Sequence, residues 1–230
     1  MKNVVQAIIL HLQKYSDKAS ILHTYTLQNG RLSFMVYGAN SKRRKFSHYQ
    51  PLTLVEIEST TSQTRDIPTL NNISLTNITN NISLDFSRRA IAIFISEIIF
   101  RTLRHPEADE RLFNYIKNVI LELDSTPQPE NIHLKFLIDY TFYLGIMPQL
   151  DEYDKMLDIT TGELINPYKR TNCFTVDETN ILISLSANKE ITIDRTTRQI
   201  ILRKLCYYYQ IHLEDFITPK SLDILMEVFN

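Results

Sequence analysis

The spacing of apolar residues changes once along this chain, near residue 80, and that change limits the folds open to it. Before that point apolar side chains recur at every second position, as Val5, Ala7 and Ile9 do, which is the period of a strand with one buried face. From about residue 83 they recur every three to four positions, as in residues 91–99 and 112–123, which is the period of a helix packed on one side. We therefore expect a β-rich N-terminal part followed by a helical remainder.

The N-terminal part is predicted to contain short strands over residues 5–9, 21–27, 31–37 and 52–57, with a weaker one near 73–78. Asn29 and Gly30 favour a tight turn between the second and third strands, because both residues tolerate the positive φ that hairpin turns require. Five short strands without a helical segment between them indicate a small closed barrel, since closure removes exposed sheet edges.

The C-terminal part is predicted to be mainly helical, with helices over residues 133–144 and 198–213 and two more that start near 175 and 218. Gly145 ends the first of these, and Thr175 with Glu178 fits a capping box. Between residues 151 and 172 the helical pattern lapses, and Gly162 suggests a small hairpin over 157–165. The predicted fold class is α+β and multidomain: a β-barrel over residues 1–80 and an α-helical domain over 81–230 with a small β-hairpin insertion.

The charge is divided unevenly along the chain. The formal net charge is −1, yet residues 1–50 hold eight Lys or Arg against one acid, Asp17, for +7. The rest of the chain holds 17 bases against 25 acids, for −8. A basic N-terminal fifth of this kind points to nucleic acid or another anionic surface.

Residues 30–51 are the centre of that basic region. A predicted strand ends at Gly38, and Lys42, Arg43, Arg44 and Lys45 follow it. A strand that carries a cationic loop is a way to hold a polyanion. The alternative is that four adjacent charges simply keep the loop solvated.

The sequence gives no support for catalysis. It has four glycines and no phosphate-binding loop or nucleophile elbow. His11 and His23 could meet across neighbouring strands, although separate surface or half-buried histidines account for them as well. The acids Asp151, Glu152, Asp154 and Asp158 do not have EF-hand spacing and are interpreted as a solvated acidic turn. We therefore expect no enzyme.

The two cysteines, Cys173 and Cys206, offer neither a disulfide framework nor a metal-binding pair, which is consistent with a reducing cytoplasm. The N-terminal apolar run is interrupted by Gln6 and is followed by no small-residue cleavage site, so it is not interpreted as a signal peptide. No segment reaches the roughly 18 to 20 apolar residues that a membrane helix needs. The expected location is the bacterial cytoplasm.

The order of the motifs resembles the RecO family of recombination mediator and DNA repair proteins, nearly from end to end. The matching pieces are, in order, TLQNG at 26–30, YGANSKRRK at 37–45, YQPL at 49–52, SE at 96–97, PE at 106–107, LF at 112–113, LEL at 121–123, FLIDYTFYLGIMPQL at 136–150, LRKL at 202–205, HL at 212–213 and KS at 220–221. No single piece is diagnostic, but their order and spacing together are specific.

The resemblance implies an oligonucleotide-binding (OB) fold barrel followed by a helical domain. It also implies binding of single- and double-stranded DNA, annealing of complementary strands, and loading of the recombinase together with RecR. The helical domain of the family binds the acidic, Phe-terminated C-terminal tail of single-stranded-DNA-binding protein. Many members carry a four-cysteine zinc module after the segment that matches Leu150. This chain has a single cysteine there, Cys173, so zinc is expected to be absent and no cofactor is predicted.

On this basis we assign candidate DNA-binding residues in and beside residues 30–51. The phosphate contacts are Arg31, Lys42, Arg43, Arg44 and Lys45, and the candidate stacking platforms are Phe46 and Tyr49. Packing inside the barrel or its loop is the alternative for the two aromatic residues.

The tail of single-stranded-DNA-binding protein requires an apolar pocket for a Phe ring with cations beside it. The candidates are Lys117 and Lys135, together with Phe136 and Tyr140. Exposed lysines on amphipathic helices are the alternative.

Two other classes of protein stay open at this point. One is an adaptor whose basic loop binds an acidic protein partner, and the other is an RNA-binding barrel module.

Overall fold

The computed structural model describes residues 2–38, 46–61, 66–77, 79–103, 107–167 and 172–228. It divides into two compact units, residues 1–126 and residues 127–230, which we call the barrel unit and the helical unit. In this division the first helices of the chain belong with the barrel. The domain boundary expected at residues 80–81 stays a prediction.

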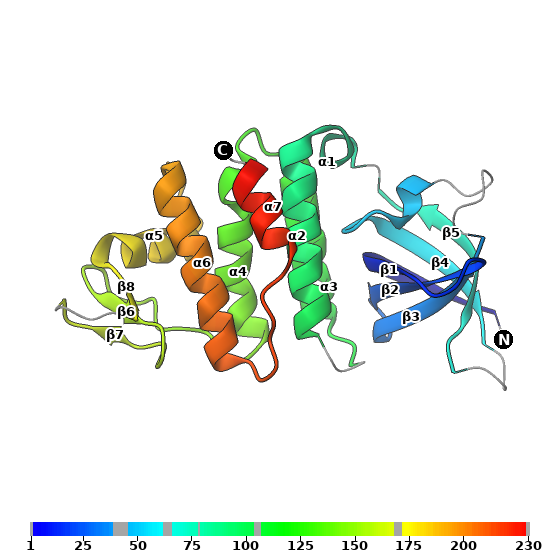
Figure 1. Ribbon diagram of the computed structural model, residues 1–230, viewed down its shortest axis with the longest axis horizontal. Coiled ribbons are helices and arrows are strands. Elements are labelled where there is room, and N and C mark those ends of the chain that lie inside the picture. The colour runs from blue at the N-terminus through cyan, green and yellow to red at the C-terminus, as the bar shows by residue number, and fades with distance from the viewer. Residues whose placement is uncertain are drawn as a thin grey trace. The chain divides into compact units, whose positions relative to one another are not determined.

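The barrel unit contains a closed five-stranded barrel in the order β1-β2-β3-β5-β4 (Figure 1). The strands are β1 (Lys2–Lys14), β2 (Ala19–Thr26), β3 (Gly30–Tyr37), β4 (Leu54–Thr60) and β5 (Thr69–Leu75). Neighbouring strands run antiparallel except β3 and β5, which are parallel and pair at Met35 and Thr69. This is the strand order of an OB fold, and it confirms the predicted fold class. The fifth strand begins earlier than the sequence pattern suggested, at Thr69.

Strand β1 takes part in two ladders. Its first half, from Lys2 to Ile8, pairs with β4, and its second half, from Ala7 to Lys14, pairs with β2. The register of the second ladder shifts between Ile9 and His11, which is the position of a β-bulge. The alternating side chains of β1 that point inward form the barrel core with those of β2 to β5. The buried members of this core are Val5, Ala7, Ile9, Leu22, Phe34, Val36, Tyr49, Val55, Ile57 and Leu70.

The predicted turn between β2 and β3 is present. Gly30 has a φ of +63°, as expected for a glycine in a tight turn, whereas Asn29 does not have a positive φ. Thr26 holds the turn closed: its Oγ1 accepts a hydrogen bond from the Asn29 N–H (3.1 Å) and donates one to the Gly30 carbonyl (2.9 Å).

Three described helices complete the barrel unit: α1 (Asn80–Leu84), α2 (Phe86–Thr102) and α3 (Glu110–Ser125). Asp85 and Asp109 cap α2 and α3, since each carboxylate accepts two backbone N–H groups of the first turn. Helix α2 packs against β1, where the Ser96 hydroxyl donates to the Leu10 carbonyl at 2.5 Å. Figure 1 shows α2 and α3 side by side.

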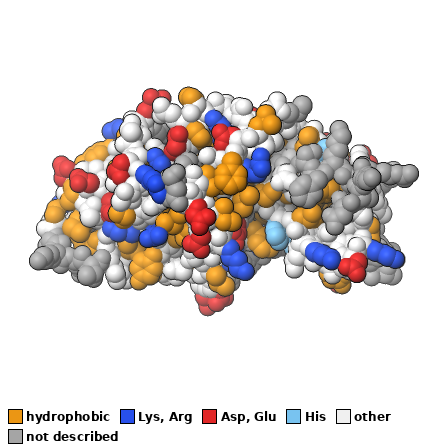
Figure 2. Space-filling view, turned by 45° about the horizontal axis from the view of Figure 1, so that its top comes forward, with side chains coloured by type: hydrophobic (Ala, Val, Ile, Leu, Met, Phe, Trp, Pro, Cys, Tyr) orange, Lys and Arg blue, Asp and Glu red, His pale blue; other side chains and the backbone are white. Residues whose placement is uncertain are grey.

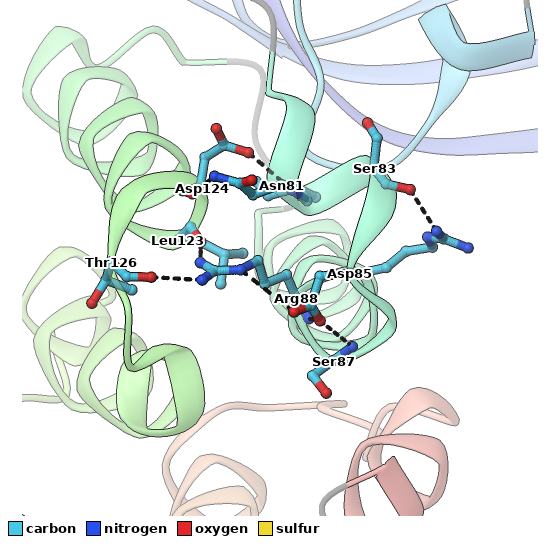
Figure 3. A network of polar contacts seen from close by, with 10 residues as sticks. Asn81, Ser83, Asp85, Ser87, Arg88, Leu123, Asp124 and Thr126 are labelled. Atoms are coloured by element: carbon cyan, nitrogen blue, oxygen red, sulfur yellow. Dashed lines mark hydrogen bonds and ion pairs between the residues drawn. The ribbon is translucent and has the colours of Figure 1, made fainter.

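Arg88, in the first turns of α2, fixes the end of α3 (Figure 3). Its guanidinium donates to the carbonyls of Leu123 and Thr126, the latter at 2.6 Å, and lies 3.8 Å from the Asp85 carboxylate. The Asp124 carboxylate accepts the Ile82 N–H at 2.9 Å, so α1 is bound to the same helix end. A cation at a helix C-terminus satisfies carbonyls that have no partner within the helix.

The helical unit contains α4 (Ile132–Tyr143), α5 (Val176–Ser186), α6 (Arg195–His212) and α7 (Ser221–Val228), with a short 3-10 turn at Pro129–Asn131. Helix α4 is buried on several sides, as its apolar pattern predicted. Gly145 ends this helix region with a φ of +70°, and the capping box of Thr175 and Glu178 is present.

The predicted hairpin is also present, as part of a slightly larger sheet. Strands β6 (Met156–Asp158) and β7 (Leu164–Ile165) are joined by β8 (Cys173–Phe174) in the order β7-β6-β8. The third strand was not predicted, because two residues are too short to show a period.

Asp158 differs from the expectation of a solvated acidic turn. Its side chain is buried, and its carboxylate accepts the Thr160 N–H at 2.8 Å. The Asp158 carboxylate therefore stabilises the turn between β6 and β7.

One face of helix α6 contacts both this small sheet and the chain that follows α4. Lys204 donates to the Cys173 carbonyl at 2.9 Å, Tyr208 to the Ile146 carbonyl at 2.7 Å, and His212 to the Ile159 carbonyl at 2.8 Å. Residues spaced by four lie one above another on a helix, so the three donors form a row along α6.

The Arg88 contacts predict a specific loss of stability. We expect Arg88→Ala to lower the free energy of unfolding by about 2–4 kcal/mol, because two carbonyls lose a charged donor and the side chain is largely buried. Urea unfolding measures this loss. Arg111→Ala, at an exposed position of α3, is the matched control and should change stability by less than about 0.5 kcal/mol. A loss for Arg88→Ala no larger than that of the control would contradict the capping role.

Candidate nucleic-acid interface

The basic segment leaves and re-enters the barrel at defined points. It follows Gly38, whose N–H donates to the Lys18 carbonyl in the β1–β2 turn at 3.1 Å. The chain is described again at a short 3-10 helix, Phe46–Tyr49. The predicted phosphate contacts Lys42, Arg43, Arg44 and Lys45 lie outside the described residues.

The Gly38 contact adds residues that the sequence reasoning did not select. Lys14 is the last residue of β1 and Lys18 lies in the β1–β2 turn, and both are exposed. Lys14 pairs with Asp17 at 3.0 Å, but both side chains are largely in solvent, so the pair is weak. The basic count of residues 1–50 included these two lysines. Their closeness to Gly38 depends on the register of the β2–β3 hairpin, which the sequence pattern does not give.

Arg31 is occupied by a structural contact. Its Nη1 donates to the carbonyls of Phe100 (3.1 Å) and Leu103 (2.5 Å), and the guanidinium lies 4.5 Å from the centre of the Phe100 ring. These carbonyls belong to the C-terminal end of α2, so Arg31 binds that helix end to β3. A contact between Arg31 and DNA stays a prediction.

The two predicted stacking residues lie in different surroundings. The backbone of Phe46 begins the 3-10 helix, and its side chain is outside the described residues. Tyr49 is 3% exposed and belongs to the barrel core, which favours packing over base stacking for this residue.

His11 and His23 do meet across the β1–β2 ladder. They are paired in register, their rings stack with centres 6.1 Å apart, and both lie against Phe100. His23 also contacts the Ser33 hydroxyl through Nδ1 at 2.8 Å. Burial, followed by the positive charge of Arg31 and then the proximity of His11, lowers the pKa of His23 to about 4. His23 is therefore uncharged at physiological pH and packs between the barrel and α2.

The candidate residues for a protein partner are distributed over both units. Lys117, on α3, lines a cavity of about 240 Å³ in the barrel unit, together with Gln6, Leu54, Asn77 and Phe113. Lys135 and its neighbours belong to the helical unit.

The structure gives the helical-unit candidates other contacts. Lys135 forms an ion pair with Asp139, one turn further along α4. Phe136 and Tyr140 are fully buried and stack with ring centres 5.0 Å apart. These contacts favour a role in packing for both aromatic residues.

The described residues form neither a cluster of metal ligands nor a reactive thiol. No group of three or more His, Cys, Asp or Glu side chains lies close enough to hold a metal ion in the described ranges. Both cysteines are buried, and burial raises the pKa of Cys206 to about 12, so its thiol is protonated at neutral pH. None of the helices in the described part of the chain combines the length and the apolar character that crossing a membrane requires.

Charges on the described surface are mixed. On the face drawn in Figure 2, Lys and Arg side chains are interspersed with Asp and Glu. That face shows no large patch of one sign among the residues it colours, so a strongly basic surface is not formed by the described side chains there.

Comparison with known proteins decides the family. The family model for the N-terminal part of recombination protein O matches residues 1–79, and the model for its C-terminal part matches residues 83–175. The chain belongs to the RecO family. Relatives named DNA repair protein RecO cover it almost completely: that of Flavobacterium psychrophilum is 32% identical over 100% of both chains, and that of Bacteroides fragilis is 32% identical over 97% of both. The RecO relative of Porphyromonas gingivalis is 29% identical over 99% of both chains.

Membership of the RecO family confirms the resemblance found in the motif order, and it makes this chain a bacterial-type DNA repair protein. The N-terminal match ends one residue before α1, so it covers the barrel. The DNA-binding candidates therefore all lie in the part matched by the N-terminal model.

The histidine cluster predicts a pH dependence of stability. The unfolded chain binds a proton at His23 below its ordinary pKa of 6.5, whereas the folded protein does so only near pH 4. Stability should therefore fall as the pH drops from about 6.5 toward 4. Urea unfolding at pH 7.5 and pH 5 should show a smaller loss for His23→Gln than for the wild type. Ser33→Ala keeps the titrating ring and should retain the wild-type loss. Equal losses for His23→Gln and the wild type would refute the assignment.

Proposed function

We propose that this RecO-family protein is a recombination mediator in DNA repair. It binds single- and double-stranded DNA, anneals complementary strands, and acts with RecR to load recombinase on DNA coated by single-stranded-DNA-binding protein. The observation that carries this proposal is the match of the whole chain to proteins named DNA repair protein RecO. The closed OB barrel with a basic segment of +7 in residues 1–50 supports it.

Annealing needs a surface that lowers the repulsion between two polyanions while their bases stay free to pair. Lysine and arginine carry their charges on long aliphatic side chains, and they neutralise phosphates without contacts to particular DNA bases. Residues 42–45 can do this, and the Gly38–Lys18 contact keeps Lys14 and Lys18 at the base of the same segment. The proposed DNA site therefore comprises residues 42–45, which follow Gly38 in the chain, and the exposed lysines at the β1–β2 turn.

The proposed mechanism is binding without chemical catalysis, and the proposed location is the bacterial cytoplasm, at the nucleoid when DNA is bound. The most direct assay is annealing of complementary strands coated with single-stranded-DNA-binding protein, with and without this protein. No acceleration of annealing would count against the proposal.

The salt dependence of DNA binding tests the role of residues 42–45. If three or four cations each neutralise a phosphate, the log–log salt slope on single strands should be about −2 to −3. Replacing Lys42, Arg43, Arg44 and Lys45 by alanine should flatten that slope and slow annealing. The control is Arg195→Ala with Arg203→Ala, two exposed positions of α6, which should keep the wild-type slope. An unchanged slope in the quadruple variant would remove these residues from the interface.

Two alternatives are separated by the same binding measurements. An adaptor protein would bind an acidic protein partner and show no affinity for DNA at moderate salt. An RNA-binding module would prefer RNA to DNA of equal length. The relatives' name, DNA repair protein RecO, favours DNA.

We also propose that the C-terminal tail of single-stranded-DNA-binding protein binds beside Lys117. That lysine lies at a cavity that Leu54, Val55 and Phe113 also line, and its ammonium group can pair with a carboxylate of the tail. Lys135 was the other candidate, but Asp139 already pairs with it.

Substitution of the two lysines tests the tail site. Lys117→Ala should weaken binding of a tail peptide several-fold, because it removes the cation at the cavity, and Lys135→Ala should have a smaller effect. Fluorescence anisotropy of a labelled peptide measures both affinities. The tail proposal fails if both variants bind the peptide as tightly as the wild type does.

A further inference from the structure

The barrel is open at the end where β1 begins, and it holds a cavity of about 520 Å³ there. We call this space the barrel-mouth cavity. The lining residues on which the argument depends are Asn3, Val5, Gln28, Asn29, Leu32 and Ser59. They come from β1, the β2–β3 turn, β3 and β4, whose places in the barrel Figure 1 shows.

The cavity lies where, among the described strands, the start of β1 has a partner on one side only. Pairing between β1 and β2 begins at Ala7, and the chain turns away at Leu27, whose N–H donates to the Gln6 carbonyl at 3.0 Å. The first residues of β1 therefore pair with β4 alone among the described strands. Strands β3 and β5 are paired at Met35 and Thr69, so no described strand pairs with the start of β3 on the side of β5.

The lining combines an apolar floor with a polar rim. Val5 and Leu32 contribute to the floor, and Val5 is 6% exposed at the edge of the barrel core. Asn3 stands opposite the buried Ser59 in the β1–β4 ladder, so an amide and a hydroxyl face the cavity together. No Lys, Arg, Asp or Glu side chain is among the described residues that line it.

The amide groups at the rim are available to a ligand. Gln28 uses its Oε1 to accept the Gln6 N–H at 3.2 Å, which leaves its NH₂ group as a donor. The side chains of Asn3 and Asn29 are exposed. A carboxamide offers both donors and acceptors, so these residues can match polar groups of either kind.

We propose that the barrel-mouth cavity binds an unpaired base of single-stranded DNA, which rests on the proposed DNA-binding function. A base has two apolar faces and a polar edge, and it carries no charge, which suits the described part of the lining. Asn and Gln amides pair well with base edges, and the cavity lies within the size range of sites for small ligands. Bases in a duplex are already paired and stacked, so this cavity selects single strands.

A strand of a partner protein is the other ligand that an open barrel wall can accept. Strand addition needs a row of free backbone groups along the edge. Here the backbone N–H and carbonyl of Gln6 are already bonded to Gln28 and Leu27, so the free edge of β1 is short. The amide side chains that line the cavity, which suit a base, offer more hydrogen bonds than the short free edge of β1 does.

The experiment compares two strands with equal numbers of phosphates. The full-length protein is titrated with a single-stranded oligonucleotide and with one of the same length that carries abasic sites throughout its centre. We expect the double variant Asn3→Ala/Asn29→Ala to bind the base-containing strand about tenfold more weakly. A change of this size corresponds to the loss of one or two ordinary hydrogen bonds. Binding to the abasic strand should not change, because that strand has no bases at its centre for the two amides to contact.

The controls separate this proposal from the function on which it rests. Asn72→Ala, an exposed amide on β5 outside the cavity, should behave as the wild type with both strands. If the double variant keeps the wild-type ratio between the two strands, the base site is overturned, although DNA binding stands. If the wild-type protein binds neither strand, the proposed function itself fails.

Discussion

The barrel depends on β1 changing its partner along its length. The strand leaves the β4 ladder as it enters the β2 ladder, and the bulge between Ile9 and His11 bends it at that point. The bend lets the sheet close on itself, and it frees the carbonyl of Leu10 from the β1–β2 register to accept the Ser96 hydroxyl of α2. The same change of partner leaves the start of β1 uncovered, so closure of the barrel and the opening at its mouth have one cause.

Two arginines of the barrel unit stabilise the C-terminal ends of helices. Arg31 and Arg88 each direct a guanidinium at the last carbonyls of a helix, α2 and α3 respectively. A buried end of a helix must have its carbonyls satisfied, and a guanidinium with several fixed donors does this for two carbonyls at once. One of the eight basic residues of the N-terminal fifth, Arg31, is therefore a structural cation.

The small sheet of the helical unit depends on α6 in a similar way. Strands of two or three residues are too short to be stable alone. Lys204 and His212 bond to carbonyls of the segment that contains them, and the carboxylate of Glu178 accepts Lys204 at 2.5 Å while it completes the cap of α5. Donors on one face of α6 thus connect β8, the turn after β6 and the start of α5.

Sequence periodicity alone determined much of this fold. The alternation of Val5, Ala7 and Ile9, the turn at Gly30, the capping box at Thr175 and the hairpin at Gly162 were all readable, because each depends on neighbours within a few residues. The motif order likewise identified the family. Tertiary structure decided which side chains are available for function: it buried Tyr49, Phe136 and Tyr140, gave Arg31 to a helix end, and assembled the barrel mouth from Asn3 and Asn29. The physical reason is that burial and hydrogen-bond partners are set by residues distant in sequence, on which a local pattern carries no information.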